Sequence, residues 1–531
     1  MKRFIPLFAA LLSGLLLFAA WPVSHLTALV FIGWIPLLWL ESTGIRKRRF
    51  FGLVYIAMFV WNVATTWWIW NASAPGAVAA FIANSFLLCF PWLGFSIVRR
   101  KWGYGYGYLA LVVFWMSFEY IHLQDWGLSW PWLTLGNAFA TQPGWIQWYE
   151  YTGTSGGTLW ILLVNIFLFQ HLRSNGTGAR NYRFLAGGLA ALAVPIGISF
   201  LLQPKTYRPN AAAATVVVVQ PNIDPYEKIS TGTFEAQLDK LIRTSEAGID
   251  STTALVVWPE TALYLDGGGM DETELQTRNN FLLKPFWAFL QRHPGISLFT
   301  GVESYRTFPA PTAQSKTYNG VHYESYNGAA LLDSSGAHGF YHKSMLVPGV
   351  ETLPWFLKFL DRWFEKFGGT TAGYARQTER TPLPEKHNFI IAPSVCYESI
   401  YGEFMSRYVR NGANIICIIT NDGWWKKTPG HKQHMNYARL RAIETRTWVA
   451  RSANTGISCV IGPDGTVYNP QPYNSAAVIR AGIYPLPNHK TFYVRYGDLL
   501  SKLALAAAVV FILLGLFIKI RNRISRMQQK N

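Results

Sequence analysis

Long apolar segments recur through the N-terminal part of the chain and once more near its C-terminus. We count eight of them, at Phe4–Trp21, Leu26–Leu40, Phe50–Trp70, Ala77–Val98, Tyr106–Ile121, Gly157–Gln170, Phe184–Leu202 and Leu499–Ile518. A helix needs about 20 apolar residues to cross a bilayer core. The composition agrees, because 50% of the residues are hydrophobic and only 14% are charged, which is unusual for a soluble protein. We therefore expect an all-α membrane domain of eight transmembrane helices, seven before a long interruption and one after it.

Basic residues set the expected orientation of these helices. They cluster beside apolar segments, at Lys2–Arg3, Arg46–Arg49, Arg99–Lys101, Arg173–Arg183 and Lys519–Lys530. No Lys or Arg occurs in the intervening loops near Pro22–His25, Asn71–Gly76 and Leu123–Gly156. By the positive-inside rule both termini are cytoplasmic and the interruption lies outside. The net charge of +18 thus comes partly from basic residues beside the spans, whose positions indicate membrane topology. A nucleic-acid site would need these residues to gather on one folded face, so we expect no nucleic-acid partner.

The first apolar segment has an alternative interpretation as a cleaved signal peptide, which also begins with basic residues and an apolar stretch. We favour an uncleaved helix, because a second span follows almost at once and Ala19-Ala20-Trp21 is a poor cleavage site. The sequence then divides into a membrane domain at 1–203, an external α/β domain at 204–494, an eighth membrane helix at 495–520 and a cytoplasmic basic tail at 521–531.

The external domain alternates short apolar runs with helical patterns, which is typical of a layered sheet flanked by helices. We expect strands at Thr215–Val219, Ala254–Trp258, Ser297–Val302, Ala329–Leu332, Phe389–Val395, Ile415–Thr420 and Ile457–Ile461. The helical patterns lie at Phe234–Ser245, Asn280–Arg292 and Gln433–Thr447.

A cysteine stands at the end of one of these strands. Cys396 follows an apolar run, and Glu398 lies two residues further on, where a helix is expected to begin. A thiol reacts as the thiolate, which a helix N-terminus or a neighbouring cation favours. On this residue alone, a buried and inert cysteine is the more common case. The four cysteines are too scattered for a disulfide scaffold.

Two further strand ends carry charged residues. Glu260 follows Trp258-Pro259, and the proline turns the chain out of the sheet. Lys343 precedes Glu351 across a Pro-Gly turn that can bring the two side chains together. A solvated ion pair is the alternative for Lys343 and Glu351.

Together, Glu260, Lys343 and Cys396 resemble the Glu-Lys-Cys triad of the nitrilase superfamily, in the same order. With the membrane spans, the whole chain resembles the bacterial apolipoprotein N-acyltransferases. Further local matches are Gln220–Ile223, Leu346–Pro348 with Glu351, Cys396–Glu398 and Trp130–Leu133. Two positions depart from the family pattern. Gly349-Val350 stands where Phe-Gly is frequent, and Tyr226 lies where a tryptophan is usual.

The resemblance implies a nitrilase-like αββα sandwich inserted between transmembrane helices 7 and 8, on the periplasmic side of the bacterial inner membrane. It implies that Cys396 takes an acyl chain from a phospholipid, with phosphatidylethanolamine as the usual donor, and passes it to the α-amino group of a diacylated apolipoprotein. Glu260 would be the base, and Lys343 with the backbone N–H of Tyr397 would hold the oxyanion. Glu351 and Glu398 would orient these groups. We expect no cofactor, no metal and a monomer.

Aromatic residues outside the triad are candidates for lipid contact. In the segment 353–367, a helical stripe combines Trp355, Phe359 and Trp363, which suits an amphipathic lid in the membrane interface or a helix packed on its own domain. Trp130 and Trp132 would line a lipid entrance or belong to an interfacial tryptophan belt.

Other functions remain open at the level of sequence. A membrane-tethered amidase would use the same triad with water as the acceptor. A transport or lipid-binding protein would need ionisable groups within the spans, for which Glu119 and His122 are the candidates. His431 and His434 have a spacing seen in metal sites, but no third ligand stands near them in the sequence.

Overall fold

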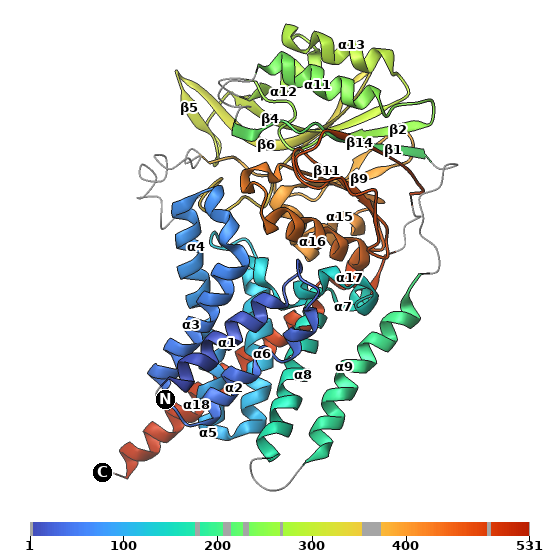
Figure 1. Ribbon diagram of the computed structural model, residues 1–531. Helices are drawn as coiled ribbons and strands as arrows, with labels where there is room; N and C mark the ends of the chain where they lie inside the picture. Colours follow the sequence, from blue (N-terminus) through green and yellow to red (C-terminus); the bar gives the residue numbers. More distant parts are fainter. Residues whose placement is uncertain are drawn as a thin grey trace.

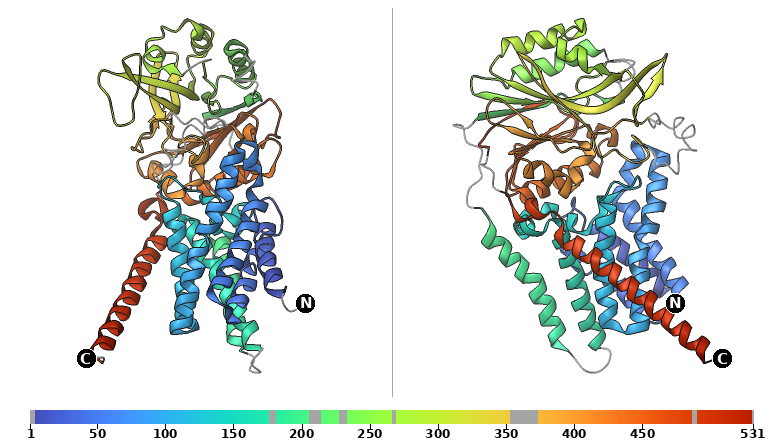
Figure 2. Two further views of the ribbon diagram at one scale, coloured as in Figure 1. Left: turned by 90° about the vertical axis from the view of Figure 1, so that its left-hand side faces the viewer. Right: turned by 180° about the vertical axis from the view of Figure 1, so that it is seen from behind.

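The structure is a computed structural model that describes residues 4–175, 181–204, 214–226, 233–265, 269–352, 373–485 and 490–529. A bundle of helices forms one end of the molecule and an α/β domain forms the other (Figure 1). The N- and C-terminal ends both lie at the end of the bundle that is far from the α/β domain (Figure 1, Figure 2). Both chain ends therefore lie on the same side of the bundle.

Helices of the N-terminal domain follow the apolar segments closely. Within the described residues, five helical stretches have the length and composition to cross a membrane, namely Lys47–Asn71, Ala74–Trp102, Thr154–Ser174, Tyr182–Leu202 and Leu499–Ser525. The helices themselves are α1 (Ile5–Ala19), η1 (Thr27–Phe31), α2 (Ile35–Ser42), α3 (Lys47–Thr66), η2 (Trp67–Asn71), α4 (Ala74–Leu87), α5 (Cys89–Trp102), α6 (Tyr104–His122), α8 (Thr154–Asn175), α9 (Tyr182–Leu202) and α18 (Leu499–Gln528).

The second apolar segment differs from the expectation. Instead of one helix over Leu26–Leu40, the chain forms the short 3-10 helix η1 and then α2, with Pro36 in the first turn of α2. Proline lacks the N–H that a continuous helix would need at that point. The segment therefore consists of two short helical pieces instead of the single continuous helix that was expected.

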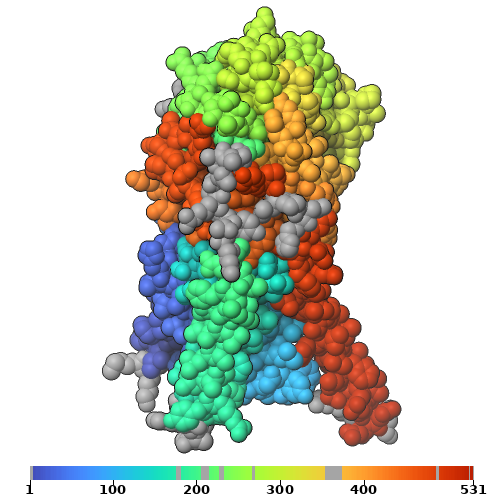
Figure 3. Space-filling model, turned by 90° about the vertical axis from the view of Figure 1, so that its right-hand side faces the viewer, coloured from blue at the N-terminus to red at the C-terminus, as the bar shows by residue number. Residues whose placement is uncertain are grey.

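Two helices expose most of their apolar side chains. On α9, Phe200 and Leu201 are 62% and 87% exposed, and on α18 Leu513 and Phe517 are 59% and 62% exposed. Helix α9 stands at the front of the bundle and α18 leans away from its edge (Figure 3). Contiguous exposed apolar surface of this kind indicates contact with lipid.

The loop between α6 and α8 is tightly packed against the bundle. It contains η3 (Pro131–Leu133), η4 (Leu135–Thr141), η5 (Pro143–Trp145) and α7 (Tyr149–Thr152). Glu119 accepts hydrogen bonds from Leu135 N at 2.8 Å and Thr158 Oγ1 at 2.6 Å, and His122 accepts one from Trp130 N at 3.0 Å. These two ionisable groups therefore hold the loop in place.

The α/β domain contains two sheets. The first has the strand order β14-β1-β2-β4-β6-β5, with β3 on β4 and β7 on β6, and the second has the order β13-β12-β11-β10-β9-β8. The strands are β1 (Ala214–Gln220), β2 (Thr253–Val257), β3 (Met270–Asp271), β4 (Ser297–Phe308), β5 (Lys316–Tyr318), β6 (Val321–Asp333), β7 (Gly336–His342), β8 (Leu383–Pro384), β9 (Ile390–Val395), β10 (Ile415–Thr420), β11 (Trp448–Ala453), β12 (Cys459–Ile461), β13 (Val467–Tyr468) and β14 (Ala477–Ile483).

Helices cover both outer faces of the paired sheets, giving the αββα order that the resemblance implied. Helices α11 (Phe234–Glu246), α12 (Glu272–Thr277) and α13 (Lys284–Arg292) cover the first sheet. Helices α15 (Gly402–Arg410) and α16 (Pro429–Thr445) lie between the second sheet and the membrane domain (Figure 1). The strands β1, β2 and β4 are parallel, as are β9, β10 and β11. Parallel strands buried on both faces read as continuous apolar runs, which explains why most of them were visible in the sequence.

Candidate active site

Three strand ends bring the expected triad residues to one cavity. Glu260 follows β2, Lys343 follows β7 and Cys396 follows β9. The Lys343 ammonium lies 3.5 Å from Glu260 Oε1, and Cys396 lines the same cavity of about 340 Å³. The arrangement places a carboxylate, an ammonium and a thiol around one space.

Glu260 is fixed by hydrogen bonds at both carboxylate oxygens. Oε1 accepts from Asn327 Nδ2 at 2.9 Å and Oε2 accepts from Asn421 N at 3.0 Å. The backbone of the glutamate also presses against β4, since a Cβ on Gly301 would lie 2.5 Å from the Pro259 carbonyl oxygen and 2.6 Å from Glu260 Cα. Only glycine permits this approach, which aims Glu260 into the cavity.

Lys343 is a buried cation between two carboxylates. Its side chain is 1% exposed, and Nζ donates to Glu351 Oε1 at 2.8 Å. Burial would lower the pKa of Lys343, but Glu351 and Glu260 outweigh it and raise the pKa above the ordinary value of 10.5. Glu351 is itself held by Asn327 Nδ2 at 3.0 Å and Val347 N at 2.8 Å. Lys343 therefore remains a charged donor at neutral pH.

Cys396 sits at a sharp turn between β9 and a short 3-10 helix, η8 (Cys396–Ile400). Its φ is +53°, a conformation that non-glycine residues rarely adopt and that is common at functional sites. The side chain is half-buried. Burial and Glu260 raise the pKa of the thiol, and the opposing effect of Lys343 is smaller. The resting group is therefore the thiol, and reaction requires a base to remove its proton.

Glu398 joins two of the catalytic loops. One oxygen accepts from Tyr341 OH at 2.6 Å and from Ser344 N at 2.7 Å, and the other accepts from Val395 N at 2.8 Å. These partners belong to the chain beside Lys343 and to the strand before Cys396. Glu398 therefore connects the loop that carries Lys343 to the turn that carries Cys396.

The cavity extends from the charged residues to the membrane helices. Its aromatic wall consists of Trp130, Trp132, Tyr374, Tyr397, Trp424 and Trp425. Small residues at the start of α4 complete it, among them Gly76, Ala77 and Ala80. A space that is charged at one end and apolar at the other suits an amphipathic substrate.

Several lining residues were not among the sequence candidates. Asn327 lies within β6, while Asn421 and Trp424 come within four residues of the end of the expected strand at Ile415–Thr420. The end of that buried strand was the sequence signal that could have identified Asn421 and Trp424. Tyr226, which stands where the family usually has a tryptophan, lies beside the aromatic wall. Its ring centroid is 5.2 Å from that of Trp424, and its hydroxyl donates to Asn71 O at 3.1 Å. The proposed lid residues Trp355, Phe359 and Trp363 lie outside the described residues.

The residue after the cysteine contacts the membrane domain directly. The Tyr397 ring stacks on Trp130, with centroids 6.0 Å apart and planes at 11°. Its hydroxyl donates to Ser129 O at 2.8 Å. Trp132, the other expected aromatic residue, donates from Nε1 to Gln433 Oε1 at 2.7 Å. The two tryptophans thus connect the loop of the membrane domain to the active site.

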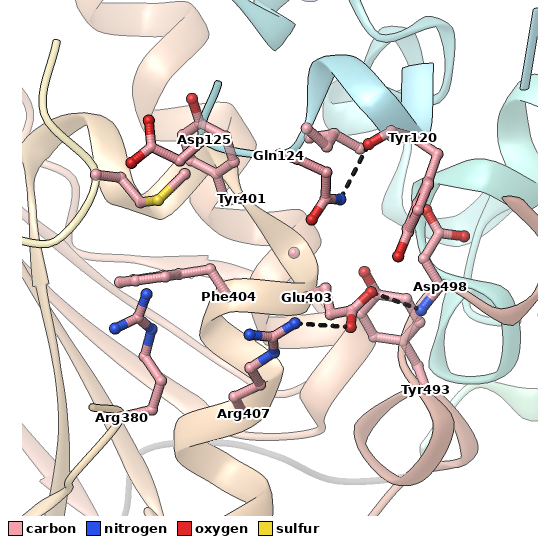
Figure 4. A pocket seen from close by; sticks show the side chains of 13 residues that line it. Tyr120, Gln124, Asp125, Arg380, Tyr401, Glu403, Phe404, Arg407, Tyr493 and Asp498 are labelled. Atoms are coloured by element: carbon pink, nitrogen blue, oxygen red, sulfur yellow. Dashed lines mark hydrogen bonds and ion pairs between the residues drawn. The ribbon is translucent and has the colours of Figure 1, made fainter. Parts of the chain in front are cut away.

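A second pocket, of about 220 Å³, lies where α6, α15 and α18 meet (Figure 4). Its charged side chains are largely engaged. Glu403 accepts from Arg407 Nη2 at 3.2 Å and from Asp498 N at 3.3 Å, while the Arg380 guanidinium lies 4.3 Å from the centre of the Phe404 ring. The contacts join the α/β domain to the start of α18.

His431 and His434, considered as metal ligands, both lie in α16. His434 Nδ1 lies 2.9 Å from Asp422 Oδ1, and the His431 ring contacts that of Tyr473 at a tilt of 31°, with centroids 4.6 Å apart. In the described part of the chain, no group of three or more His, Cys, Asp or Glu side chains is arranged to hold a metal ion.

Comparison with known proteins matches both halves of the chain. The family described as carbon-nitrogen hydrolase matches residues 215–484, and the apolipoprotein N-acyltransferase N-terminal domain matches residues 13–167. An apolipoprotein N-acyltransferase of Chlorobaculum tepidum is 29% identical over 96% of each chain. That of Rhizobium meliloti is 28% identical over 89% of this chain and 88% of its own. A carbon-nitrogen hydrolase structure from Helicobacter pylori G27 covers 53% of this chain and 91% of its own, with 16% identity and a TM-score of 0.37. The chain belongs to the carbon-nitrogen hydrolase family and, within it, to the apolipoprotein N-acyltransferases.

Proposed function

We propose that this protein transfers a fatty acyl chain from a phospholipid to the N-terminal α-amino group of diacylated apolipoproteins. The observation that carries the proposal is the continuous cavity. Glu260, Lys343 and Cys396 stand at one end of it, and residues of the membrane helices line the other. Relatives that match nearly the whole chain carry the name apolipoprotein N-acyltransferase.

The first step forms a thioester. Glu260 takes the proton from Cys396, and the sulfur attacks the carbonyl carbon of a phospholipid acyl ester. The carbonyl oxygen becomes an oxyanion, which Lys343 and the backbone N–H of Tyr397 stabilise. As the intermediate collapses, the ester C–O bond breaks, the proton returns from Glu260 to the leaving alkoxide, and a lysophospholipid departs. We propose phosphatidylethanolamine as the usual donor.

The second step transfers the acyl group to nitrogen. The α-amino group of the diacylglyceryl cysteine attacks the thioester carbonyl carbon, Glu260 accepts a proton from that nitrogen, and the thiolate leaves and is reprotonated. The products are an amide and the free thiol of Cys396. Each step needs only acid-base groups present in the cavity, so the scheme requires no cofactor.

Both substrates carry acyl chains anchored in the bilayer. Holding the site at the membrane surface raises the effective concentration of each and avoids extraction of the chains into water. An enclosed aromatic cavity also limits hydrolysis of the thioester. We infer eight membrane-crossing segments in the bacterial inner membrane, with both termini cytoplasmic and the catalytic domain periplasmic, in a monomer. The common side of the termini supports this topology (Figure 1).

Mass spectrometry of the purified protein with an acyl-labelled phospholipid tests the proposal. We expect label on Cys396, and its transfer to a diacylated lipopeptide that has a free amino group. Cys396→Ser should block stable thioester labelling, while the control Cys417→Ser, at a buried strand position, should not. Release of the label to water at the same rate with and without lipopeptide would identify a membrane-tethered amidase, and absence of label would refute the enzymatic function.

A further inference from the structure

A buried histidine contacts the backbone of the catalytic cysteine from the side of α16. His434 is fully buried. Its Nε2 lies 3.1 Å from the Cys396 carbonyl oxygen and 2.9 Å from Ser399 Oγ. Because a carbonyl oxygen can only accept a hydrogen bond, Nε2 must carry a proton to bond to it. Ser399 Oγ donates to the same carbonyl at 2.9 Å.

Two buried charges support this histidine. His434 Nδ1 lies 2.9 Å from Asp422 Oδ1, and Asp422 Oδ2 accepts from Arg451 Nη2 at 2.8 Å. All three side chains are fully buried. Burial would raise the pKa of Asp422, but Arg451 and His434 outweigh it and lower the pKa below the ordinary value. A buried ionic network is weak evidence for net stability, and the contact of this one with the backbone of Cys396 points to a role in positioning.

The contacted carbonyl shares a peptide unit with the expected oxyanion donor. The C=O of Cys396 and the N–H of Tyr397 belong to one planar trans amide and point in opposite directions. Hydrogen bonds to the carbonyl therefore fix the direction of the N–H. They also polarise the amide, which strengthens the N–H as a donor. The positive φ of Cys396 makes this support necessary, because the turn is strained on its own.

We propose that His434, held by Asp422 and Arg451, is a positioning residue that aligns the Tyr397 N–H with the developing oxyanion. The inference rests on the proposed acyl transfer and adds to it a group that touches neither substrate. Loss of such support typically lowers activity by about 10- to 100-fold. The effect falls on kcat for thioester formation and leaves the KM for phospholipid unchanged, because His434 does not line the cavity.

Two reactions of the Cys396 sulfur can distinguish a loss of oxyanion alignment from a general loss of reactivity of the cysteine. Thioester formation passes through an oxyanion, whereas alkylation by iodoacetamide is a displacement at a saturated carbon and needs no oxyanion donor. We would measure both rates at Cys396 by mass spectrometry in the full-length protein. His434→Asn keeps an amide near Asp422 but does not reach the Cys396 carbonyl, and His434→Gln extends an amide N–H to the Nε2 position. His434→Leu removes both contacts.

We expect His434→Asn and His434→Leu to slow thioester formation by about 10- to 100-fold with unchanged alkylation, and His434→Gln to recover most of the rate. The matched control is His431→Leu, one turn earlier in α16 and equally buried, which should leave both rates unchanged. Equal loss of both rates in His434→Asn, or thioester formation at the wild-type rate, would overturn the inference alone. A wild-type protein that forms no thioester would overturn the proposed function, and the inference with it.

Discussion

Replacement of Glu351 by glutamine tests the electrostatic role of Lys343. The Lys343 Nζ lies 2.8 Å from Glu351 Oε1 and 3.5 Å from Glu260 Oε1, with the lysine side chain 1% exposed. With an effective dielectric constant of about 20, the nearer pair attracts by about 6 kcal/mol and the farther by about 5 kcal/mol. Glutamine keeps the shape of the side chain but removes the nearer charge. Removing this charge should therefore lower the pKa of Lys343.

The sign of the pH effect follows from the direction of this shift. Lys343 acts as a cation, so its contribution is present below its pKa and is lost as pH rises through it. In the wild type that pKa lies above 10.5, and no alkaline loss from Lys343 is expected at pH 6–10. In Glu351→Gln, burial is opposed mainly by Glu260, so the pKa of Lys343 is lower and we expect the rate to decline toward the alkaline end of this range. At pH 7, the weaker hold of residue 351 on Lys343 should also slow thioester formation by about 10- to 100-fold.

The assay is the initial rate of acyl-thioester formation at Cys396, measured by mass spectrometry between about pH 6 and 10, a range that brackets the shift expected for the lysine. Glu246→Gln is a control, because this carboxylate is 37% exposed and pairs with Arg292 at the surface. Its pH profile should match that of the wild type. If Glu351→Gln shows the wild-type profile on the alkaline side, the carboxylate does not set the charge of Lys343 and the reasoning is refuted.

Three further changes have specific expected outcomes. Asp422→Asn leaves Arg451 buried without its anion, so urea unfolding should show a free energy of unfolding that is lower by about 3–5 kcal/mol. In the wild type, the contribution of Asp422 to stability is present above about pH 4 and is lost as pH falls through the lowered pKa of Asp422. Gly301→Ala should displace Glu260 and sharply lower the rate of thioester formation, while the midpoint of thermal unfolding changes little. A loss of rate that is fully explained by unfolding of the variant would contradict the packing argument. Serine at the expected lid positions should impair acyl transfer without unfolding the catalytic domain, as judged by transfer rates and circular dichroism of a triple variant of Trp355, Phe359 and Trp363.

The sequence identified the triad residues but not the residues that hydrogen-bond to them. Glu260 and Cys396 follow the buried apolar strands β2 and β9, and such strand ends are visible locally because the apolar run stops there. Lys343 follows β7, a Gly- and His-containing strand that is only partly buried, so its position was suggested by the nearby Glu351 and by the family resemblance. The contacts that Glu260 makes were not visible in this way. Asn327 reaches the site through the antiparallel pairing of β4 with β6, and Asn421 follows β10 of the second sheet and donates to Glu260 across the two sheets. Such contacts depend on which strands pair, and no local pattern specifies that.

One buried strand was missed for a related reason. Strand β11 carries Arg451 at its centre, and an arginine in the middle of a short segment argues against a buried strand in sequence analysis. In the structure, Asp422 neutralises the charge from a neighbouring element. The charge and its partner are 29 residues apart, so the compensation becomes apparent only when the sheet is assembled.

Helix α16 shows that the membrane domain is part of the framework of the active site. Gln433 donates to Thr65 O at 3.1 Å and Tyr437 donates to Trp132 O at 2.8 Å, so one face of the helix is fixed to the membrane domain. From the same helix, His434 bonds to the carbonyl of the catalytic cysteine. A displacement of the helix by the membrane domain would therefore move the backbone that carries the nucleophile. If the proposed acyl transfer is correct, the helical domain would therefore contribute to alignment of the reacting groups as well as to the lining of the cavity.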